Sequence, residues 1–374
     1  MASGFWKNLP KPIYALAPMA NVTDCAFRRI IARYSKYGGR DIGDGSKASL
    51  PAEALRVGGP DVMFTEFTSC DGLQSPGREN LLIDFKYTEA ERPIVAQIFG
   101  SKPDNFYKTA LLCQELGFDG IDINMGCPDR NVEKQCAGAA LMKDPKLAQE
   151  CIKATERGAG KLPISVKTRI GFNKNELATW LPTLLETNLA AITIHCRTRK
   201  EMSNVPARWE EIAAAVKIRD EFDSSPDKTL ILGNGDVKNL AEANEKIRQT
   251  GCDGVMIGRG IFGNPWLFAN CHSERGTTEE SRSFAPLRMT TYVPTIEEKL
   301  RVMVEHTYLF EKLLGDKKNF DIMKKHYKAY VNGFDGAKEL RVKLMGEARD
   351  AGTVENIVVK FIGSGLHEWA ARPH

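Results

Sequence analysis

The sequence predicts an α/β protein, a parallel (β/α)8 TIM barrel followed by a small C-terminal helical domain. Eight short apolar runs, rich in β-branched residues, end in Gly, Pro or polar residues, and helix-like stretches separate most of them. Continuous apolar runs of this length are typical of parallel strands that are buried on both faces. Eight alternations of strand and helix within about 250 residues are the pattern of a (β/α)8 barrel.

The eight predicted strands cover residues 14–20, 63–67, 94–100, 120–126, 164–171, 191–197, 230–236 and 254–260. The four clearest helical stretches between them cover residues 105–116, 144–157, 209–222 and 240–249. A doubly wound open sheet is the alternative, but it usually has fewer strands and carries a phosphate-binding loop after the first strand. This chain has Pro18, Met19 and Ala20 at that point, which favours the closed barrel.

Two segments interrupt the alternation and lead into a helical region. Residues 37–59 are Gly-rich, residues 271–291 are rich in Ser, Arg, Glu and Thr, and both are interpreted as surface insertions. Thr295 and Glu298 then form a capping box at the start of a helical pattern. Helical stretches follow over residues 295–314, 322–331, 337–348 and 354–362. We therefore predict a barrel domain over residues 1–270 with an insertion at 37–59, a linker over 271–294 and a helical domain over 295–374.

The composition excludes several classes of protein. With 42% hydrophobic and 27% charged residues, the 374-residue chain is globular, not disordered. The nine cysteines include no Cys-x-x-Cys pair and no zinc-like Cys/His spacing, so we expect free thiols, a cytoplasmic location and no metal. No apolar stretch approaches the length of a membrane span, and the first residues lack the apolar segment of a secretion signal. The net charge of +4 permits a nucleic-acid partner without implying one.

The last two predicted strands end in glycine-rich loops. Gly233, Asn234, Gly235 and Asp236 follow one strand, and Gly258, Arg259 and Gly260 follow the next. Barrel enzymes bind phosphate at this position, where bare backbone N–H groups and a helix N-terminus face the anion. Tight turning between strand and helix is the alternative explanation, but two such loops together favour a phosphate-bearing cofactor.

Polar side chains at the ends of other predicted strands suggest which groups would contact such a cofactor. Lys167 could hold the electron-rich edge of a flavin or neutralise a substrate anion, although a salt bridge in the barrel mouth is the alternative. Gln97 offers a donor and an acceptor, which match the edge of an isoalloxazine or a pyrimidine. His195 could be a base or a cofactor contact, and no other histidine lies at metal-ligand spacing.

Cys127 is the candidate catalytic residue because it follows a predicted strand directly, in the stretch Asn124-Met125-Gly126-Cys127-Pro128. An ordinary thiol is mostly protonated at neutral pH and can act as a general acid. It could instead be a nucleophile if a neighbouring base made it a thiolate, or merely a small buried residue.

Basic residues are placed to meet a phosphate-rich substrate. Arg169, Arg197 and Arg199 follow two strand ends at the predicted mouth of the barrel. Basic and aromatic residues also alternate in residues 317–343, a combination that suits RNA backbone and exposed bases. The candidate RNA contacts there are Lys324, Lys325, Lys328 and Arg341. A solvated charged loop and a solvated helix face are the alternatives.

Together these motifs carry a family resemblance. They are LAPMANVTDCAFRR at 16–29, AQIFG at 96–100, DINMGCPDRNVEKQCAGAAL at 122–141, VKTRIGF at 166–172, HCRTRKEM at 195–202, GNGDV at 233–237, GRGIFGNPWLF at 258–268 and HYKAYVNGFDGAKELRVKLM at 326–345. In this order and spacing the chain resembles the tRNA-dihydrouridine synthases, most closely the bacterial B-type branch. These are FMN-dependent barrel oxidoreductases with a C-terminal RNA-binding domain.

The resemblance implies a reaction and roles for particular residues. It implies that FMN is held by Pro18, Met19, Ala20, Gln97, Lys167, His195, Asn234, Gly235, Asp236, Gly258 and Arg259. NADPH would reduce the FMN, which would pass hydride to C6 of a uridine in tRNA, and Cys127 would protonate C5. Asn124 would contact the target uracil, and a monomer is expected.

Two other functions remain as alternatives. One is an FMN-barrel oxidoreductase of the dihydroorotate-dehydrogenase or old-yellow-enzyme type, acting on a free small molecule without need of a basic helical domain. The other is an RNA-binding barrel that has lost catalysis. The presence of Cys127, Lys167 and both glycine loops argues against the second alternative.

Overall fold

The chain divides into two compact units. The computed structural model describes residues 4–52, 56–269 and 293–363. The barrel unit comprises Met1–Ala20, Pro60–Tyr87 and Glu91–Gly260, and the helical unit comprises Asn21–Gly59, Thr88–Ala90 and Ile261–His374. Most of the predicted linker over 271–294 lies outside the described residues, namely residues 271–292. Within those residues, no helix has the length and apolar character needed to cross a membrane.

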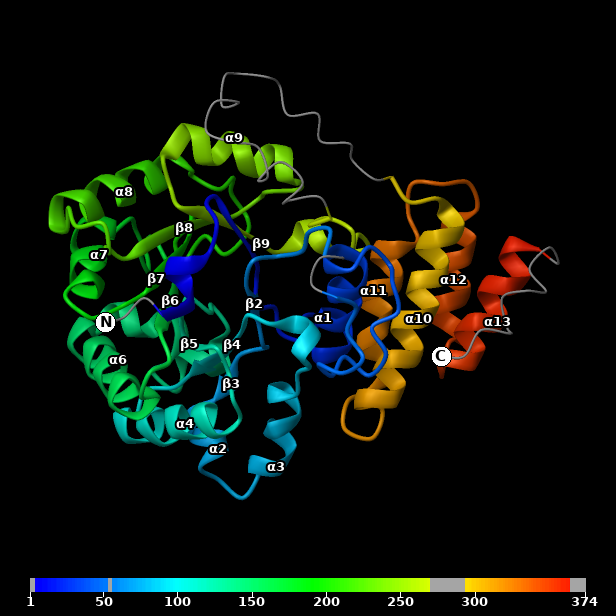
Figure 1. Ribbon diagram of the computed structural model, residues 1–374, viewed down its shortest axis with the longest axis horizontal. Coiled ribbons are helices and arrows are strands. Elements are labelled where there is room, and N and C mark those ends of the chain that lie inside the picture. The colour runs from blue at the N-terminus through cyan, green and yellow to red at the C-terminus, as the bar shows by residue number, and fades with distance from the viewer. Residues whose placement is uncertain (1–3, 53–55, 270–292, 364–374) are drawn as a thin grey trace. The chain divides into compact units, whose positions relative to one another are not determined.

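The strands of the barrel unit form one parallel sheet that closes on itself (Figure 1). They are β1 (Ile13–Leu16), β2 (Met63–Phe64), β3 (Thr68–Ser69), β4 (Ile94–Phe99), β5 (Gly120–Met125), β6 (Ile164–Arg169), β7 (Ala191–His195), β8 (Leu230–Asn234) and β9 (Gly254–Ile257). The order is β1-β9-β8-β7-β6-β5-β4-β2, and β3 also pairs with β4, so β2 and β3 share one strand position. Ala15 bridges Val62 to complete the ring. The predicted (β/α)8 fold is confirmed.

Helices surround the strands of this unit (Figure 1). They are α2 (Cys70–Leu73), α3 (Arg78–Leu81), α4 (Pro103–Glu115), α5 (Arg130–Glu133), α6 (Pro145–Ala159), α7 (Leu177–Leu185), α8 (Glu210–Phe222) and α9 (Leu240–Thr250). The four predicted helices are α4, α6, α8 and α9, and side-chain capping accounts for the starts of α6 and α9. The Asp144 side chain accepts from the Leu147 N–H before α6, and that of Asn239 accepts from the Glu242 N–H before α9.

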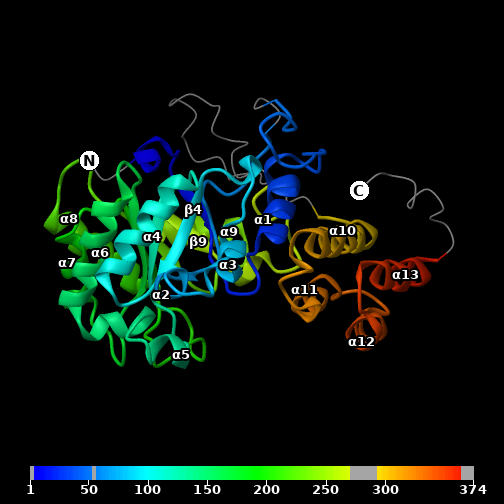
Figure 2. The ribbon, with the colours of Figure 1, turned by 90° about the horizontal axis from the view of Figure 1, so that it is seen from below.

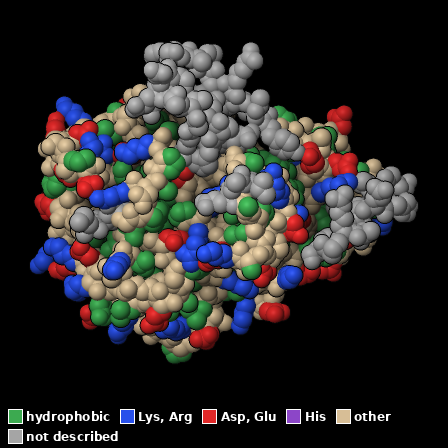
Figure 3. Space-filling view, viewed as in Figure 1, with side chains coloured by type: hydrophobic (Ala, Val, Ile, Leu, Met, Phe, Trp, Pro, Cys, Tyr) green, Lys and Arg blue, Asp and Glu red, His purple; other side chains and the backbone are tan. Residues whose placement is uncertain are grey.

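One end of the barrel is covered by the short helix η1 (Gly4–Asn8), whose Trp6 packs in the same apolar cluster as Ile13, Ala191 and Leu232. These residues lie at or near the starts of their strands, so η1 covers the amino-terminal end. On the barrel part of the face in Figure 3, Lys and Arg side chains are interspersed with Asp and Glu. That face therefore presents no extended patch of one sign.

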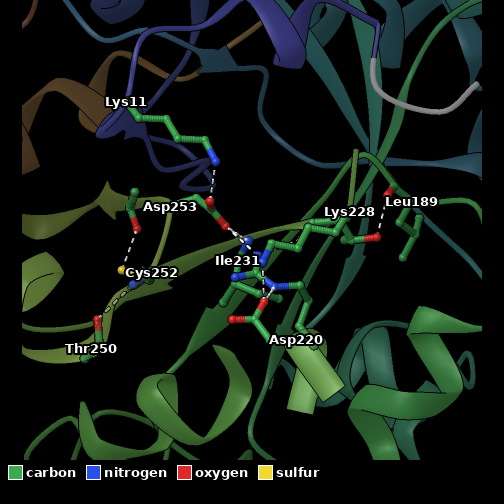
Figure 4. Close-up of polar contacts among 11 residues, drawn as sticks. Lys11, Leu189, Asp220, Lys228, Ile231, Thr250, Cys252 and Asp253 are labelled. Atoms are coloured by element: carbon green, nitrogen blue, oxygen red, sulfur yellow. Dashed lines mark hydrogen bonds and ion pairs between the residues drawn. The ribbon is translucent and has the colours of Figure 1, made fainter. Parts of the chain in front are cut away.

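Asp253, directly before β9, makes polar contacts with several elements at the amino-terminal end of the barrel (Figure 4). Its carboxylate accepts from Lys11 Nζ at 2.6 Å, from Arg219 Nη1 at 2.7 Å and from the Ile231 backbone N–H at 2.9 Å. These partners come from the segment before β1, from α8 and from β8. Arg219 is almost fully buried and also bonds Asp220, at 2.6 Å. The network stabilises the closure of the ring at β1 and β9.

We expect Asp253→Ala to lower the free energy of unfolding by about 3 kcal/mol, because it leaves the buried Arg219 guanidinium without its main counter-charge. Asp227→Ala is the control, since it removes an exposed ion pair with Lys7 that contributes about 0–1 kcal/mol. Denaturant unfolding of both variants measures the difference. Equal losses in the two variants would contradict the structural role given to Asp253.

The described helices of the second unit pack as neighbours in the order of the chain. They are α1 (Cys25–Ile31), α10 (Ile296–Leu314), α11 (Met323–Tyr330), α12 (Ala337–Glu347) and α13 (Ala351–Ile362). Figure 2 shows α10 to α13 as a bundle, with α10 against α11 and α13. The predicted capping box is present, because Thr295 Oγ1 accepts from the Glu298 N–H while the Glu298 carboxylate accepts from the Thr295 N–H.

Two histidines lie in the core of this unit. His306 on α10 and His326 on α11 are fully buried, with ring centroids 4.5 Å apart, and the Phe27 ring from α1 lies 5.1 Å and 4.8 Å from them. No ring nitrogen of either histidine has a hydrogen-bond partner within the described ranges. Burial lowers the pKa of His306 well below its ordinary value and that of His326 to about 3. Both are therefore neutral in the folded protein near pH 7.

We expect the helical unit to lose stability in acid. The unfolded chain binds protons at these histidines below about pH 6.5, whereas the folded chain does not until its much lower pKa is reached. Stability is therefore lost as pH falls through 6.5 toward 3, and at pH 5 the loss from His326 alone is about 2 kcal/mol. Melting temperatures between pH 5 and 7 measure it. His326→Phe should flatten this dependence, and an unchanged slope would contradict the assignment.

Candidate active site

The predicted reactive residues of the barrel unit gather at the carboxyl ends of its strands. Gln97 lies near the end of β4, Asn124 of β5, Lys167 and Arg169 of β6, His195 of β7 and Asn234 of β8. Pro18, Met19 and Ala20 follow β1, Cys127 follows β5, and Gly258 follows β9. Barrel enzymes place their active sites at this end. The site therefore combines side chains from most of the strands.

The loop that carries Cys127 is fixed through its backbone. Asn124 Oδ1 accepts from the Gly126 N–H at 3.1 Å and from the Cys127 N–H at 2.9 Å. The Cys127 carbonyl accepts from the Ala139 N–H at 3.1 Å, and Gly138, with φ at +60°, packs closely against it. None of these bonds uses the thiol. Burial raises the pKa of Cys127, so the thiol is protonated near neutral pH.

A chain of side-chain hydrogen bonds runs from this loop across three strands. Asn124 Nδ2 donates to Gln97 Oε1 at 3.1 Å, and Gln97 Nε2 donates to Asp122 Oδ2 at 2.6 Å. Ser165 Oγ donates to Asp122 Oδ1 at 2.6 Å. Gln97 pairs with Asp122 and Asp122 with Ser165 in the strand register, so the three side chains lie on one face of β4, β5 and β6. Asp122 is fully buried and anchors the chain.

Lys167 introduces a positive charge into this interior. Its ammonium makes no hydrogen bond or ion pair with the described residues. Burial and the charge of Arg169 together lower the pKa of Lys167 to about 8, and the charge of Asp122 opposes both. A half-buried cation whose N–H donors have no partner among the described residues is a natural contact for an electron-rich ligand.

A second charged cluster lies beyond β7 and β8. Asp236 pairs with Arg197, pairs with Arg259 at 2.6 Å and accepts from the Ala207 N–H at 2.9 Å. Arg197 Nη1 also lies 3.1 Å from His195 Nε2. Burial and the surrounding cations hold the pKa of His195 well below its ordinary value, so its imidazole is neutral. A neutral ring beside Arg197 can accept one hydrogen bond and donate another.

The glycine loops provide bare backbone. Gly235 has φ at +132°, and a Cβ there would lie 2.8 Å from Ala207 Cβ and 3.2 Å from His195 Cδ2, so only glycine fits. At Gly258 an added Cβ would touch Ala17 Cβ and Met19 Sδ at 3.5 Å, so the loops after β1 and β9 approach each other. This backbone, together with a Lys167 ammonium that has no partner in the described part of the chain, fits a cofactor with a phosphate end and an electron-rich ring.

Two of the arginines predicted to contact RNA brace loops instead of projecting freely. Arg169 donates to the carbonyls of Gly126 at 2.7 Å, Thr198 at 3.1 Å and Met202 at 3.0 Å. Arg199 pairs with Glu133 of α5, with Nη2 to Oε2 at 2.6 Å. These contacts join the loops after β5, β6 and β7 around Cys127.

The four C-terminal candidates belong to the helical unit. Lys325 and Lys328 on α11 are exposed. Lys324 pairs with Asp321 at 2.7 Å, and Arg341 on α12 donates to the Val331 carbonyl at 2.6 Å.

Sequence reasoning missed Asp122, Ser165 and Glu133. Asp122 stands inside an otherwise apolar run, two residues before Asn124, so strand alternation places both on one face. An acidic residue in a buried strand was the available signal. Within the described parts of the chain, no group of three or more His, Cys, Asp or Glu side chains could hold a metal ion.

Comparisons with known proteins identify the family of this chain. A family model described as "Dihydrouridine synthase (Dus)" matches residues 15–363. A Staphylococcus aureus (strain MRSA252) protein named "Probable tRNA-dihydrouridine synthase" is 39% identical over 348 residues, which are 92% of each chain. The "Probable tRNA-dihydrouridine synthase 2" of Bacillus subtilis (strain 168) is 38% identical over 92% of this chain and 93% of its own. The solved structure of morphinone reductase aligns at 12% identity and a TM-score of 0.46, over 71% of this chain and 88% of its own. The predicted resemblance is confirmed: the chain belongs to the dihydrouridine synthase family.

Proposed function

We propose that this protein is a tRNA-dihydrouridine synthase, which reduces the C5=C6 bond of uridine in tRNA. The observation that carries the proposal is the placement of Cys127, held through its backbone N–H by Asn124, next to Lys167, which pairs with Asn124 in the strand register and makes no ion pair with a described residue. The family match over nearly the whole chain and the names of the relatives supply the substrate class.

The proposed cofactor is FMN, and the proposed reductant is NADPH. Lys167 and Gln97 would hold the ring, with His195 as a further polar contact, while the backbone at Gly235 and Gly258 would face the phosphate. The remaining proposed contacts are Pro18, Met19, Ala20, Asn234, Asp236 and Arg259. When bound and reduced, FMN supplies hydride to C6 of the uracil.

Cys127 completes the reduction as general acid. Its raised pKa keeps a proton on Sγ at neutral pH, and this proton goes to C5 of the uracil. Asn124 holds the backbone of the Cys127 loop, and its Nδ2 is the proposed contact to the uracil. Arg169 and Arg199 shape the loops around the thiol, and Arg197 holds Asp236 beside the glycine loop after β8.

The target base must leave its stack to reach this site, so the enzyme needs further contacts with the RNA. We assign these to the helical domain at residues 295–374, chiefly Lys324, Lys325, Lys328 and Arg341, which suit a phosphate backbone. We further propose a cytoplasmic monomer.

The test is a spectroscopic cycle with the purified protein. We expect a yellow protein whose bound FMN is bleached by NADPH and regains its colour on addition of tRNA that lacks dihydrouridine. Free uridine should restore the colour far more slowly. Failure to bind FMN after reconstitution would contradict the proposal, and equal rates with free uridine would favour a small-molecule substrate.

A further inference from the structure

We propose that Asp122 is a positioning residue that organises the site as a carboxylate, by orienting the Gln97 amide and, through it, the Asn124 amide that holds the Cys127 loop. This inference rests on the proposed function, because Gln97 and Lys167 are the side chains assigned to the flavin. Asp122 itself is fully buried, with no exposure to solvent, and pairs with Gln97 in the strand register, so it acts on the site through its neighbours.

The orientation of Gln97 follows from what a carboxylate can accept. Asp122 Oδ2 receives the Gln97 Nε2 donor at 2.6 Å, which leaves Gln97 Oε1 facing Asn124 Nδ2 at 3.1 Å. An ionised carboxylate can only accept hydrogen bonds, so it must face the NH2 group of Gln97 and permits only this orientation of the Gln97 amide. Asn124 Oδ1 is then the oxygen that holds the Cys127 N–H. One buried carboxylate thus fixes two amides and, through them, the catalytic loop.

The charge of Lys167 depends on the same carboxylate. Lys167 has no ion-pair partner among the described residues, and the Asp122 charge is the largest influence that raises its pKa against burial and Arg169. Burial raises the pKa of Asp122 to about 6, against the bonds from Ser165 and Gln97 and the charge of Lys167. Between about pH 6 and pH 8 both groups are therefore ionised.

The other titratable groups that act on Asp122 and Lys167 each keep one protonation state between pH 5 and pH 7. Burial raises the pKa of Cys127, and it raises that of Cys196 to about 12. Burial lowers the pKa of Arg169 to about 10 and that of His195 well below 6.5. Among these groups, only Asp122 changes its charge between pH 5 and 7.

The test compares flavin affinity of Asp122→Asn and the wild type from pH 5 to 8. Asn keeps the shape but not the charge, so we expect about tenfold weaker binding at pH 7, the loss of one charge-assisted contact. At pH 5 the wild-type carboxylate is protonated, so the two affinities should converge. Riboflavin serves as a second probe, because it lacks the phosphate of FMN, which itself titrates near pH 6. Asp119→Asn is the control, since Asp119 precedes the same strand and its carboxylate bonds Arg92 and the Ile94 N–H, outside this chain of hydrogen bonds.

A second variant keeps the test decisive if Asp122→Asn does not fold. Ser165→Ala removes one hydrogen bond from the carboxylate and so raises its pKa, which should move the acid loss of flavin binding to higher pH. The inference would be overturned if Asp122→Asn and the wild type bound flavin equally well, or if the ratio of their flavin affinities did not change with pH. It would also be overturned if the pH dependence of flavin binding in Ser165→Ala were the same as in the wild type. If the wild type itself binds no flavin, the proposed function fails and takes this inference with it.

Discussion

Cys127→Ala should lower the rate of uridine reduction by about 10²–10⁴-fold while leaving flavin binding unchanged. The loss follows from the removal of the only group assigned to protonate C5. Binding survives because the loop is held through the Cys127 backbone N–H and carbonyl, and alanine retains both. Single-turnover oxidation of the reduced flavin by tRNA measures the rate, and flavin fluorescence measures the binding.

Cys136→Ala is the matched control, because it removes an exposed thiol from the segment that follows α5. We expect it to turn over tRNA at the wild-type rate. Undiminished turnover in Cys127→Ala would remove Cys127 as the acid. Loss of activity in both variants would mean that the region, not the thiol, is needed.

Lys167→Met should weaken FMN binding by about 10–100-fold, because a charged contact in a buried site contributes roughly 1.5–3 kcal/mol. The free energy of unfolding of the apoprotein should change by only about 1 kcal/mol. Methionine fills a similar volume and removes a half-buried cation that has no hydrogen-bond partner among the described residues. Flavin titration and denaturant unfolding of the same preparation separate the two effects.

Lys200→Met supplies the comparison for that experiment. Lys200 is exposed and lies beyond β7, so its loss should leave FMN affinity unchanged. Wild-type affinity in Lys167→Met, or equal losses in both variants, would contradict the role given to Lys167.

Much of the fold could be predicted because its signals are local. Each barrel strand is a short apolar run, and the capping box at Thr295 marks the start of α10. Helix α7 was missed because it is only nine residues long and contains Pro182, which normally opposes a helix interior. The division of the second strand position into β2 and β3 also escaped prediction, because each is only two residues long.

The positions of the site residues were predictable, but their partners were not. The end of a parallel strand locates Gln97, Lys167 and Cys127 from the sequence alone. That Arg199 pairs with Glu133 depends on contacts between residues 66 positions apart. The anchoring of Gln97 by Asp122 likewise depends on strand register, which a single sequence does not specify.

The central claim is that this site adds hydride to C6 and a proton to C5 of uridine in tRNA. The most direct measurement is nucleoside mass spectrometry of dihydrouridine-free tRNA treated with the holoenzyme and NADPH in deuterated water. The predicted product is 5,6-dihydrouridine with solvent-derived deuterium at C5, the position that the Cys127 proton reaches. Uridine left unreduced by a protein that holds reduced FMN would contradict the claim, as would dihydrouridine without solvent deuterium at C5.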